Sequence, residues 1–158
     1  MTARHPPLPA ATDLTTVFFP NTDICISFKS LVMTIAEEIK AAQASARNYP
    51  ELVNKLLYAG VQSYTVEVST GITLYRLQNG SLHLHTPGTE PREVALAFDR
   101  QHTVEAIRSN QEGKIDYREF MGEIARAGVR FYEATLNGNN KRVTYIGLGG
   151  FYEESVPV

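Results

Sequence analysis

The sequence predicts an α+β domain in which a helix–helix–β–β–β unit occurs twice around a pseudo-twofold axis. We expect a mostly antiparallel sheet with the helices on one face. Three observations support this prediction. Residues 37–68 align with residues 105–136 without a gap. Each aligned segment passes from helical periodicity to alternation of apolar and polar residues. Short turn motifs, typical of antiparallel neighbours, then separate the strand-like runs.

The internal match is the strongest signal in the chain. With a small gap it continues, because GITLYRLQNGSLHLHTP aligns with KRVTYIGLGGFYEESVP. We therefore predict a duplication with repeats at about 35–87 and 103–157, inside one domain that spans 31–158. Nine residues recur at the same spacing: Glu37, Ile39, Gln43, Tyr49, Glu51, Ala59, Gly60, Val61 and Tyr64 match Glu105, Ile107, Gln111, Tyr117, Glu119, Ala127, Gly128, Val129 and Tyr132.

Composition narrows the class of protein. The chain has 158 residues, 43% hydrophobic and 20% charged, as in an ordinary globular domain. Its net charge of -2 gives no reason to expect nucleic acid, which usually needs a basic face. No apolar run reaches the roughly 20 residues of a membrane helix, so no membrane association is expected. The single cysteine and the lack of a secretory signal favour a cytoplasmic protein. Residues 1–30 read as a partly disordered leader.

Two helices are expected in each repeat. Phe28, Leu31, Ile35 and Ile39 share one helical face, and Val104 and Ile107 begin a similar stripe in the second repeat. The second helices are predicted at Tyr49–Tyr58 and Tyr117–Arg126. Gly60 and Gly128 follow them, where a residue without Cβ most easily adopts a left-handed cap.

Strands are expected after the helices. Alternation begins at Tyr64 and again at Tyr132, and the runs ITLYRL and RVTYIG follow turn residues. LHLHT and FYEESV supply third strands, and Asn79-Gly80 suits a tight hairpin turn. REVALAF, between the repeats, is interpreted as an additional strand. Exposed sheet edges make a homodimer plausible, by edge or by face packing.

The stretch NQEGKIDYREF resembles the end of a calcium-binding loop. Placing Gly113 sixth puts Arg108 in the first ligand position, where the loop needs a carboxylate. The matching segment of the first repeat also lacks the glycine and most of the ligands. We interpret the stretch as a helix start, with Asp116 and Glu119 forming a capping box, as Asn48 and Glu51 would in the first repeat.

Histidines offer one candidate ligand site. His83 and His85 share a strand face, and His102 or Asp99 could supply a third ligand to a metal. The alternative is a pair of rim histidines with Leu82 and Leu84 facing inward. We favour this alternative and predict no metal site, since no third ligand is specified.

Tyrosines offer another candidate site. Tyr64 and Tyr132 occupy matching positions at strand starts, where core packing is the favoured interpretation. If the repeats face one another, the two rings could line a shared pocket with Glu67 and Glu133 nearby. Alternation argues that these glutamates point to the other face, so such a pocket would need edges or loops.

Other chemistry is not indicated by the sequence. Cys25, between Ile24 and Ile26, is interpreted as a small buried side chain rather than a nucleophile. No phosphate-binding glycine loop or nucleophile elbow is present, so no cofactor and no catalytic residue is predicted. Gln43 and Gln111 recur in both repeats without an assigned role.

The second repeat also resembles a known family. The runs AIRSNQEGKIDYREF, AGVRFYEATL and RVTYIGLGGFYEESVP, together with AFD at 97–99, are similar to an uncharacterised bacterial and prophage domain of unknown function. Some of its members carry the label "phage envelope protein". The resemblance covers roughly residues 35–158 and implies no activity, cofactor or catalytic residue.

Two function classes follow. The first is a non-enzymatic binding or interaction protein, of prophage origin by the resemblance, that acts on a small ligand or a protein partner. The alternative is a small enzyme that uses Tyr, Glu and His side chains for acid–base chemistry in a pocket between the repeats. Candidate ligand-binding residues in either case are Tyr64, Tyr132, Glu67, Glu133, His83, His85 and His102.

Overall fold

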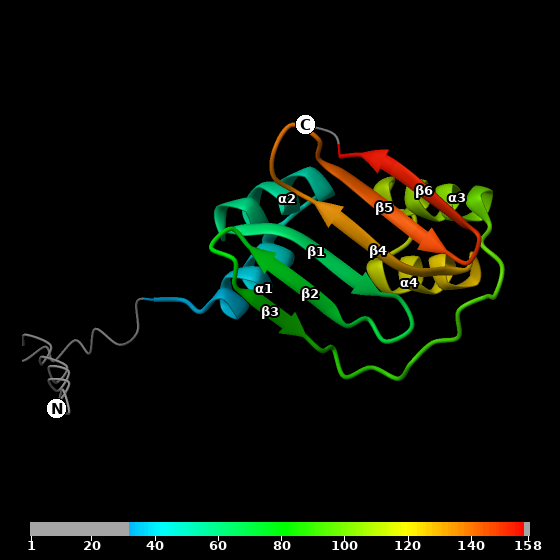
Figure 1. Cartoon of the computed structure of the whole chain (residues 1–158), viewed down its shortest axis with the longest axis horizontal. Coiled ribbons are helices and arrows are strands. Elements are labelled where there is room, and N and C mark those ends of the chain that lie inside the picture. Colours follow the sequence, from blue (N-terminus) through cyan, green and yellow to red (C-terminus); the bar gives the residue numbers. More distant parts are fainter. Residues whose placement is uncertain (1–31, 157–158) are drawn as a thin grey trace, which may run out of the picture. The chain divides into compact units, whose positions relative to one another are not determined.

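The computed structural model describes residues 32–156, which form four helices and one six-stranded sheet. The predicted leader and Cys25 lie outside the described residues. Two helices followed by three strands occur twice along the chain (Figure 1). Their bounds are α1 (Ile35–Ser45), α2 (Tyr49–Tyr58), β1 (Val61–Glu67), β2 (Thr73–Leu77), β3 (Leu82–His85), α3 (Arg100–Gln111), α4 (Tyr117–Arg126), β4 (Val129–Thr135), β5 (Arg142–Gly147) and β6 (Gly150–Ser155).

Capping residues set the helix starts. The predicted capping box at α4 is confirmed: the Asp116 side chain accepts from the Glu119 amide at 2.8 Å, and the Glu119 carboxylate accepts from the Asp116 amide at 2.9 Å. The equivalent box at α2 is only half formed. Asn48 accepts from the Glu51 amide at 2.9 Å, but the Glu51 carboxylate turns to the amide and guanidinium of Arg47. Both second helices keep their predicted bounds.

All neighbouring strands in the sheet are antiparallel, in the order β3-β2-β1-β4-β5-β6. The two central strands come from different halves of the chain and pair from Ser63–Thr135 to Glu67–Phe131. The predicted α+β class is therefore confirmed. The β1–β2 and β4–β5 ladders even shift register at matching places, after Val61 and after Val129. A duplication would produce this likeness, and it stays a prediction.

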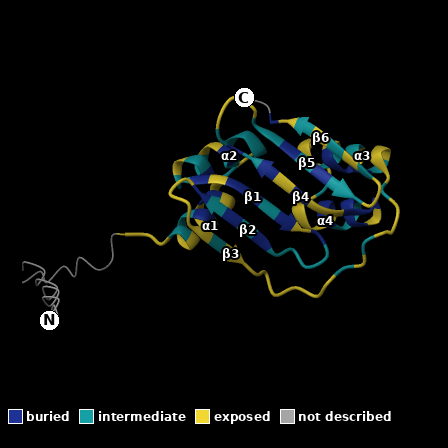
Figure 2. Ribbon diagram, viewed as in Figure 1, coloured by how far each residue is buried: buried dark blue, intermediate teal, exposed yellow. Residues whose placement is uncertain are grey.

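One face of the sheet is covered and carries the core. The four helices lie on that face (Figure 1), with α1 packed on α2 and α3 packed on α4. Buried and exposed residues alternate along the central strands (Figure 2), as expected for a sheet covered on one side only. The core lies between the helices and the sheet, where Leu56 of α2, Ile124 of α4 and Val66 of β1 are fully buried.

Two sequence predictions about secondary structure are wrong. REVALAF forms no strand; instead the amides of Ala95 and Asp99 donate to the carbonyls of Ala125 and Ala127, at the end of α4. Residues 32–34 are not helical, because Thr34 caps α1 and the helix begins at Ile35.

Candidate functional site

Six aromatic rings, one from each strand, form a row across the helix-covered side of the sheet. Neighbouring ring centroids lie 5.4 to 6.4 Å apart, so adjacent rings are in contact. The strand register produces the row, because it pairs Tyr75 with Tyr64 and Tyr145 with Tyr132. We call this set the tyrosine row. In order across the sheet it consists of His83, Tyr75, Tyr64, Tyr132, Tyr145 and Tyr152.

Two more tyrosines reach the row from the helices. Tyr49 is the first residue of α2, and its hydroxyl lies 2.9 Å from the hydroxyl of Tyr64. Tyr117 is the first residue of α4, and its hydroxyl lies 3.1 Å from that of Tyr132. As a whole residue Tyr117 is 57% exposed, whereas Tyr132 is buried. Together with the tyrosine row, Tyr49 and Tyr117 make up what we call the tyrosine cluster.

A pair of matching glutamines distinguishes the two halves of the cluster. Gln43 of α1 donates to the Tyr75 hydroxyl at 2.9 Å. Gln111 of α3 instead donates to the Glu154 carboxylate at 3.0 Å. Tyr145, which occupies the place of Tyr75 in the second half, therefore has no hydrogen-bond partner among residues 32–156. This explains the role of both glutamines, which the sequence alone left unassigned.

The free hydroxyl of Tyr145 is unusual for its degree of burial. The residue is only 6% exposed. No described side-chain nitrogen or oxygen is both sealed from solvent and unpaired, so the Tyr145 hydroxyl retains contact with solvent. A polar atom in this position can bind an incoming group without losing any protein hydrogen bond.

The tyrosine hydroxyls are held in their protonated form. Burial raises the pKa of Tyr49 to about 12, although the hydrogen bond with Tyr64 works in the other direction. Burial also raises the pKa of Tyr75 to about 12. For Tyr145, burial and then the nearby charge of Glu154 raise the pKa well above its ordinary value. At neutral pH these hydroxyls are neutral and can donate hydrogen bonds.

Glu154 is the carboxylate of the cluster. It is half-buried on β6, on the same side of the sheet as Tyr152. Burial raises its pKa, and the hydrogen bonds from Gln111 and Tyr152 offset only part of this effect. This end of the cluster therefore holds both a donor, the free Tyr145 hydroxyl, and an acceptor, the Glu154 carboxylate.

We expect this carboxyl to make stability depend on pH. Because the folded pKa of Glu154 lies above its ordinary value of 4.5, its contribution is complete below that pH and is lost as pH rises through the folded pKa. Glu154→Gln keeps an acceptor for Gln111 but has no charge. The free energy of unfolding, measured with urea near pH 4 and near pH 7, should fall less between these two pH values in the variant than in the wild type. Parallel profiles would contradict this expectation.

The structure brings only part of the predicted site together. Tyr64 and Tyr132 meet at the centre of the row, with an edge-to-face contact at 6.4 Å. Glu67 and Glu133 point to the opposite face, as the alternation indicated. Glu67 accepts from the amides of Ser69 and Thr70. Partial burial opposes its ionisation, but these hydrogen bonds outweigh burial and lower its pKa. Neither glutamate joins the tyrosine cluster.

The three histidines do not converge: His83 and His85 lie two residues apart on β3, and His102 lies on α3. His83 stacks beside Tyr75 at the end of the tyrosine row, whereas His85 is exposed. His102 binds Glu123 between α3 and α4, with 2.8 Å between Nε2 and a carboxylate oxygen. Within residues 32–156, no group of three His, Cys, Asp or Glu side chains is arranged to hold a metal ion.

The predicted orientation of strand β3 is wrong. We expected Leu82 and Leu84 to face inward and the two histidines to lie at the rim. Instead Leu82 and Leu84 are exposed on the uncovered face, because they pair with Arg76 and Leu74 of β2. The neighbouring strand sets this orientation, since it places Tyr75 opposite His83 on the covered side.

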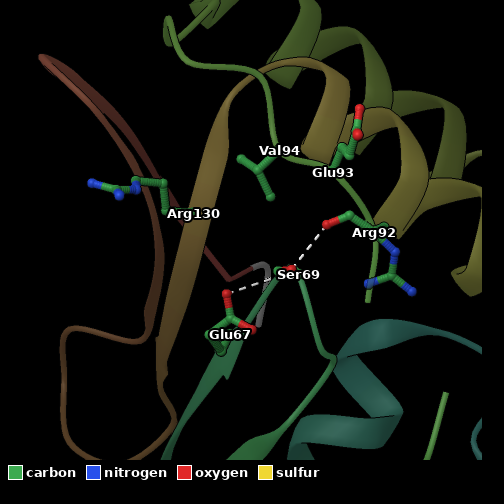
Figure 3. A pocket seen from close by; sticks show the side chains of 6 residues that line it. All are labelled: Glu67, Ser69, Arg92, Glu93, Val94 and Arg130. Atoms are coloured by element: carbon green, nitrogen blue, oxygen red, sulfur yellow. Dashed lines mark hydrogen bonds between the residues drawn. The ribbon is translucent and has the colours of Figure 1, made fainter. Parts of the chain in front are cut away.

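A separate hollow of about 420 Å³ lies beyond the end of β1 (Figure 3). Ser69 donates to the Arg92 carbonyl at 2.9 Å and thereby ties the turn to the linker between the halves. Arg92 itself donates to the Val68 carbonyl. In Figure 3 the guanidinium groups of Arg92 and Arg130 point away from each other, so they do not form an anion clamp.

Comparison with known proteins identifies the family. Residues 37–150 match a family model described as "Protein of unknown function (DUF1398)", which is more than half of the 158-residue chain. The chain belongs to the DUF1398 family. The expected membership in a domain family of unknown function is thus confirmed, and nothing in the match indicates a specific activity.

Relatives of this DUF1398 protein occur in mycobacteria. The uncharacterized proteins Mb2035 of Mycobacterium bovis and Rv2012 of Mycobacterium tuberculosis are each 33% identical to it over 118 residues. The alignment covers 70% of this chain and 71% of each relative. Neither the family description nor these names mention a phage. Among the described residues, no helix is long and apolar enough to cross a membrane.

Sequence reasoning missed most of the cluster. Seven of the eight tyrosines belong to it, and only Tyr58, fully exposed on α2, lies apart. The internal alignment already contained the signal, since Tyr49 recurs as Tyr117 and Tyr75 recurs as Tyr145. Glu154 carried no such signal, because the internal alignment places Leu84 at the matching position of the first repeat.

Proposed function

We propose that this DUF1398 protein is a non-enzymatic binding protein that takes a small organic ligand at the tyrosine cluster. The ligand would carry a flat, apolar ring and a hydrogen-bonding group. The observation that carries the proposal is the hydroxyl of Tyr145. The residue is buried, but its hydroxyl keeps contact with solvent and has no partner among the described residues.

The chemistry of the cluster supports this class of ligand. Tyrosine rings offer flat apolar surface with little conformational entropy to lose on binding. The neutral hydroxyls donate hydrogen bonds, and the Glu154 carboxylate accepts them. A ligand that stacks on a ring near Tyr145 and bonds its hydroxyl would replace solvent there without breaking any bond of the Tyr49–Tyr64 or Gln43–Tyr75 pairs.

We expect Tyr145→Phe to weaken ligand binding at least about tenfold, because a hydrogen bond to a buried group is lost. Tyr75→Phe is the matched control: it occupies the equivalent place, but its hydroxyl is already bonded to Gln43. The first measurement is a native mass spectrum of the full chain, purified without dialysis. A small-molecule mass should be retained by the wild type and by Tyr75→Phe, and lost by Tyr145→Phe.

A titration with defined probes complements this measurement. The chain contains no tryptophan, so its intrinsic fluorescence comes from tyrosine, and seven of the eight tyrosines lie in the cluster. 4-Nitrophenol, 4-nitroaniline and 4-nitrobenzoate, which do not fluoresce, test rings with a donor, an amine and an acid through the quenching of this tyrosine emission. A bare mass together with no response to these probes would contradict the proposal and favour a protein partner.

The alternative function, an acid–base enzyme, draws on the same residues. Its support is the proximity of Glu154 to the hydroxyl of Tyr145. The raised pKa of the tyrosines disfavours them as bases at neutral pH. Turnover of a retained ligand, seen as a change of its mass during incubation and abolished by Glu154→Gln, would replace the binding proposal with this one.

Origin and compartment belong to the same proposal. We place the protein in the reducing cytoplasm on the basis of its single cysteine. Prophage origin rests on the sequence resemblance alone. Cell fractionation followed by detection of the chain tests the compartment, and the genes that flank its own test the origin.

A further inference from the structure

The uncovered side of the sheet, which we call the open face, carries a second surface, distinct from the tyrosine cluster. No described helix covers it (Figure 1). Alternation directs the side chains between the tyrosines to this face, for example Thr65 beside Tyr64 and Glu133 beside Tyr132. Antiparallel sheets often face water on one side, so an open face alone indicates nothing about a partner.

This open face is more apolar at its margins than a solvated surface requires. Leu84 on β3 is 59% exposed and Phe151 on β6 is 65% exposed, so both lie at the outer strands. Leu74 and Leu82 extend the first margin. Phe131 and Ile146, which pair across β4 and β5, extend the second. Between the two apolar margins lie serine and threonine together with Glu67, Glu133 and Arg142, so the face combines apolar borders with a polar centre.

The size of the open face suits a protein partner of equal size. Six strands at a spacing of about 4.8 Å span roughly 29 Å, and strands of this length extend roughly 20 Å. The resulting area, on the order of 600 Å² before surface relief is counted, approaches the about 800 Å² that each partner contributes to a standard interface. A small molecule would occupy only a fraction of it.

The charges of the open face are mutually complementary. Arg142 and Glu153 already form an ion pair at 3.3 Å. Arg76 donates to Thr65 at 2.9 Å and has no carboxylate partner among the described residues. Glu133 is exposed on the adjoining half and has no described partner either. Arg76 on β2 and Glu133 on β4 are thus without a charged partner among the described residues. Glu67, on the same face, is bound by the amides of Ser69 and Thr70 instead.

We propose that the open face binds the open face of a second copy of this chain. Two sheets packed face to face lie about 10 Å apart, with side chains interdigitated. A twofold axis that lays β2 of one copy across β4 of the other would bring each Arg76 toward the partner's Glu133, twice by symmetry. In this placement β3 lies over β5 of the other copy, so the margin at Leu84 is covered, whereas β6 with Phe151 extends past the partner sheet.

The oligomeric state of the full chain tests this proposal. Sedimentation velocity over a range of protein concentrations should show a monomer–dimer equilibrium for the wild type. Leu84→Asp should raise the dimer dissociation constant at least about tenfold, because it places a carboxylate in the covered apolar margin. Phe151→Asp, on the overhanging β6, should change the dissociation constant little. Tyr58→Asp is the matched control, since Tyr58 is 97% exposed but lies on α2, away from the open face.

A charge exchange tests the pairing itself. Arg76→Glu alone and Glu133→Arg alone should each weaken the dimer, and the double variant should restore it. A wild type that stays monomeric at every concentration overturns the proposal. A dimer that survives Leu84→Asp also overturns it and indicates pairing at a sheet edge instead. A double variant that fails to recover overturns the Arg76–Glu133 contact.

Discussion

Gly128→Ala is expected to lower the free energy of unfolding by roughly 2 to 5 kcal/mol. Two costs add: a left-handed backbone with a side chain, about 1–2 kcal/mol, and overpacking, about 1–3 kcal/mol. Gly128 has a φ of +79°, and a Cβ there would lie 2.1 Å from the Ala97 carbonyl oxygen. That carbonyl belongs to the linker segment whose amides bind the end of α4, so it has little freedom to withdraw.

Gly60→Ala is the matched control, because Gly60 occupies the equivalent place after α2. Its φ is +88°, but a Cβ there would meet no described atom within 4 Å. Only the backbone cost of about 1–2 kcal/mol should remain. Urea denaturation of the three proteins measures both losses. Equal losses at the two glycines would contradict the close packing of residues 95–99 on the end of α4.

Ile124→Ala is expected to lower the free energy of unfolding by roughly 2 to 5 kcal/mol. Ile124 lies on the buried side of α4 and is fully enclosed between this helix and the sheet. Truncation removes apolar contacts and leaves a cavity that the surrounding elements fill only in part. Leu56→Ala in α2 removes the corresponding side chain of the first half and should cost a similar amount.

Tyr58→Ala provides the control for these core variants. Tyr58 is also on α2, but its side chain is in solvent, so its replacement should change stability by no more than about 0.5 kcal/mol. Thermal and urea unfolding followed by circular dichroism give the comparison. A loss below about 1 kcal/mol for Ile124→Ala would show that the core collapses into the space, contrary to a core shared by α4 and the sheet.

Local patterns account for what could be predicted of the fold. The bounds of α2 and α4 follow from Asn48 and Asp116 as caps and from the glycines behind the helices, all within a few residues of one another. The strand runs follow from alternation, which reports that one side is buried. The errors occur where contacts are distant. REVALAF has the composition of a strand, but Phe98 packs against Gly147 and Gly150, some fifty residues away, and the segment stays irregular.

The candidate site was only partly predictable for the same reason. Tyr64 and Tyr132 stood out because they recur. Their partners Tyr49 and Tyr117 recur as well, but nothing local states that a helix start lies above a strand. Glu154 and Tyr145 belong to different strands, and their relation to Gln111 depends on how α3 lies on β6.

The sequence by itself determined the helices, their caps, the alternation of the strands and the likeness of the two halves, because these depend on neighbours within one turn or one hairpin. Tertiary structure alone decided that β1 pairs with β4, and so that seven tyrosines meet on one face. It also decided that Gln43 binds Tyr75 while Gln111 binds Glu154, which leaves one hydroxyl of the cluster free. These pairings depend on packing between elements far apart in the chain. Two halves with similar sequences can therefore form different hydrogen bonds.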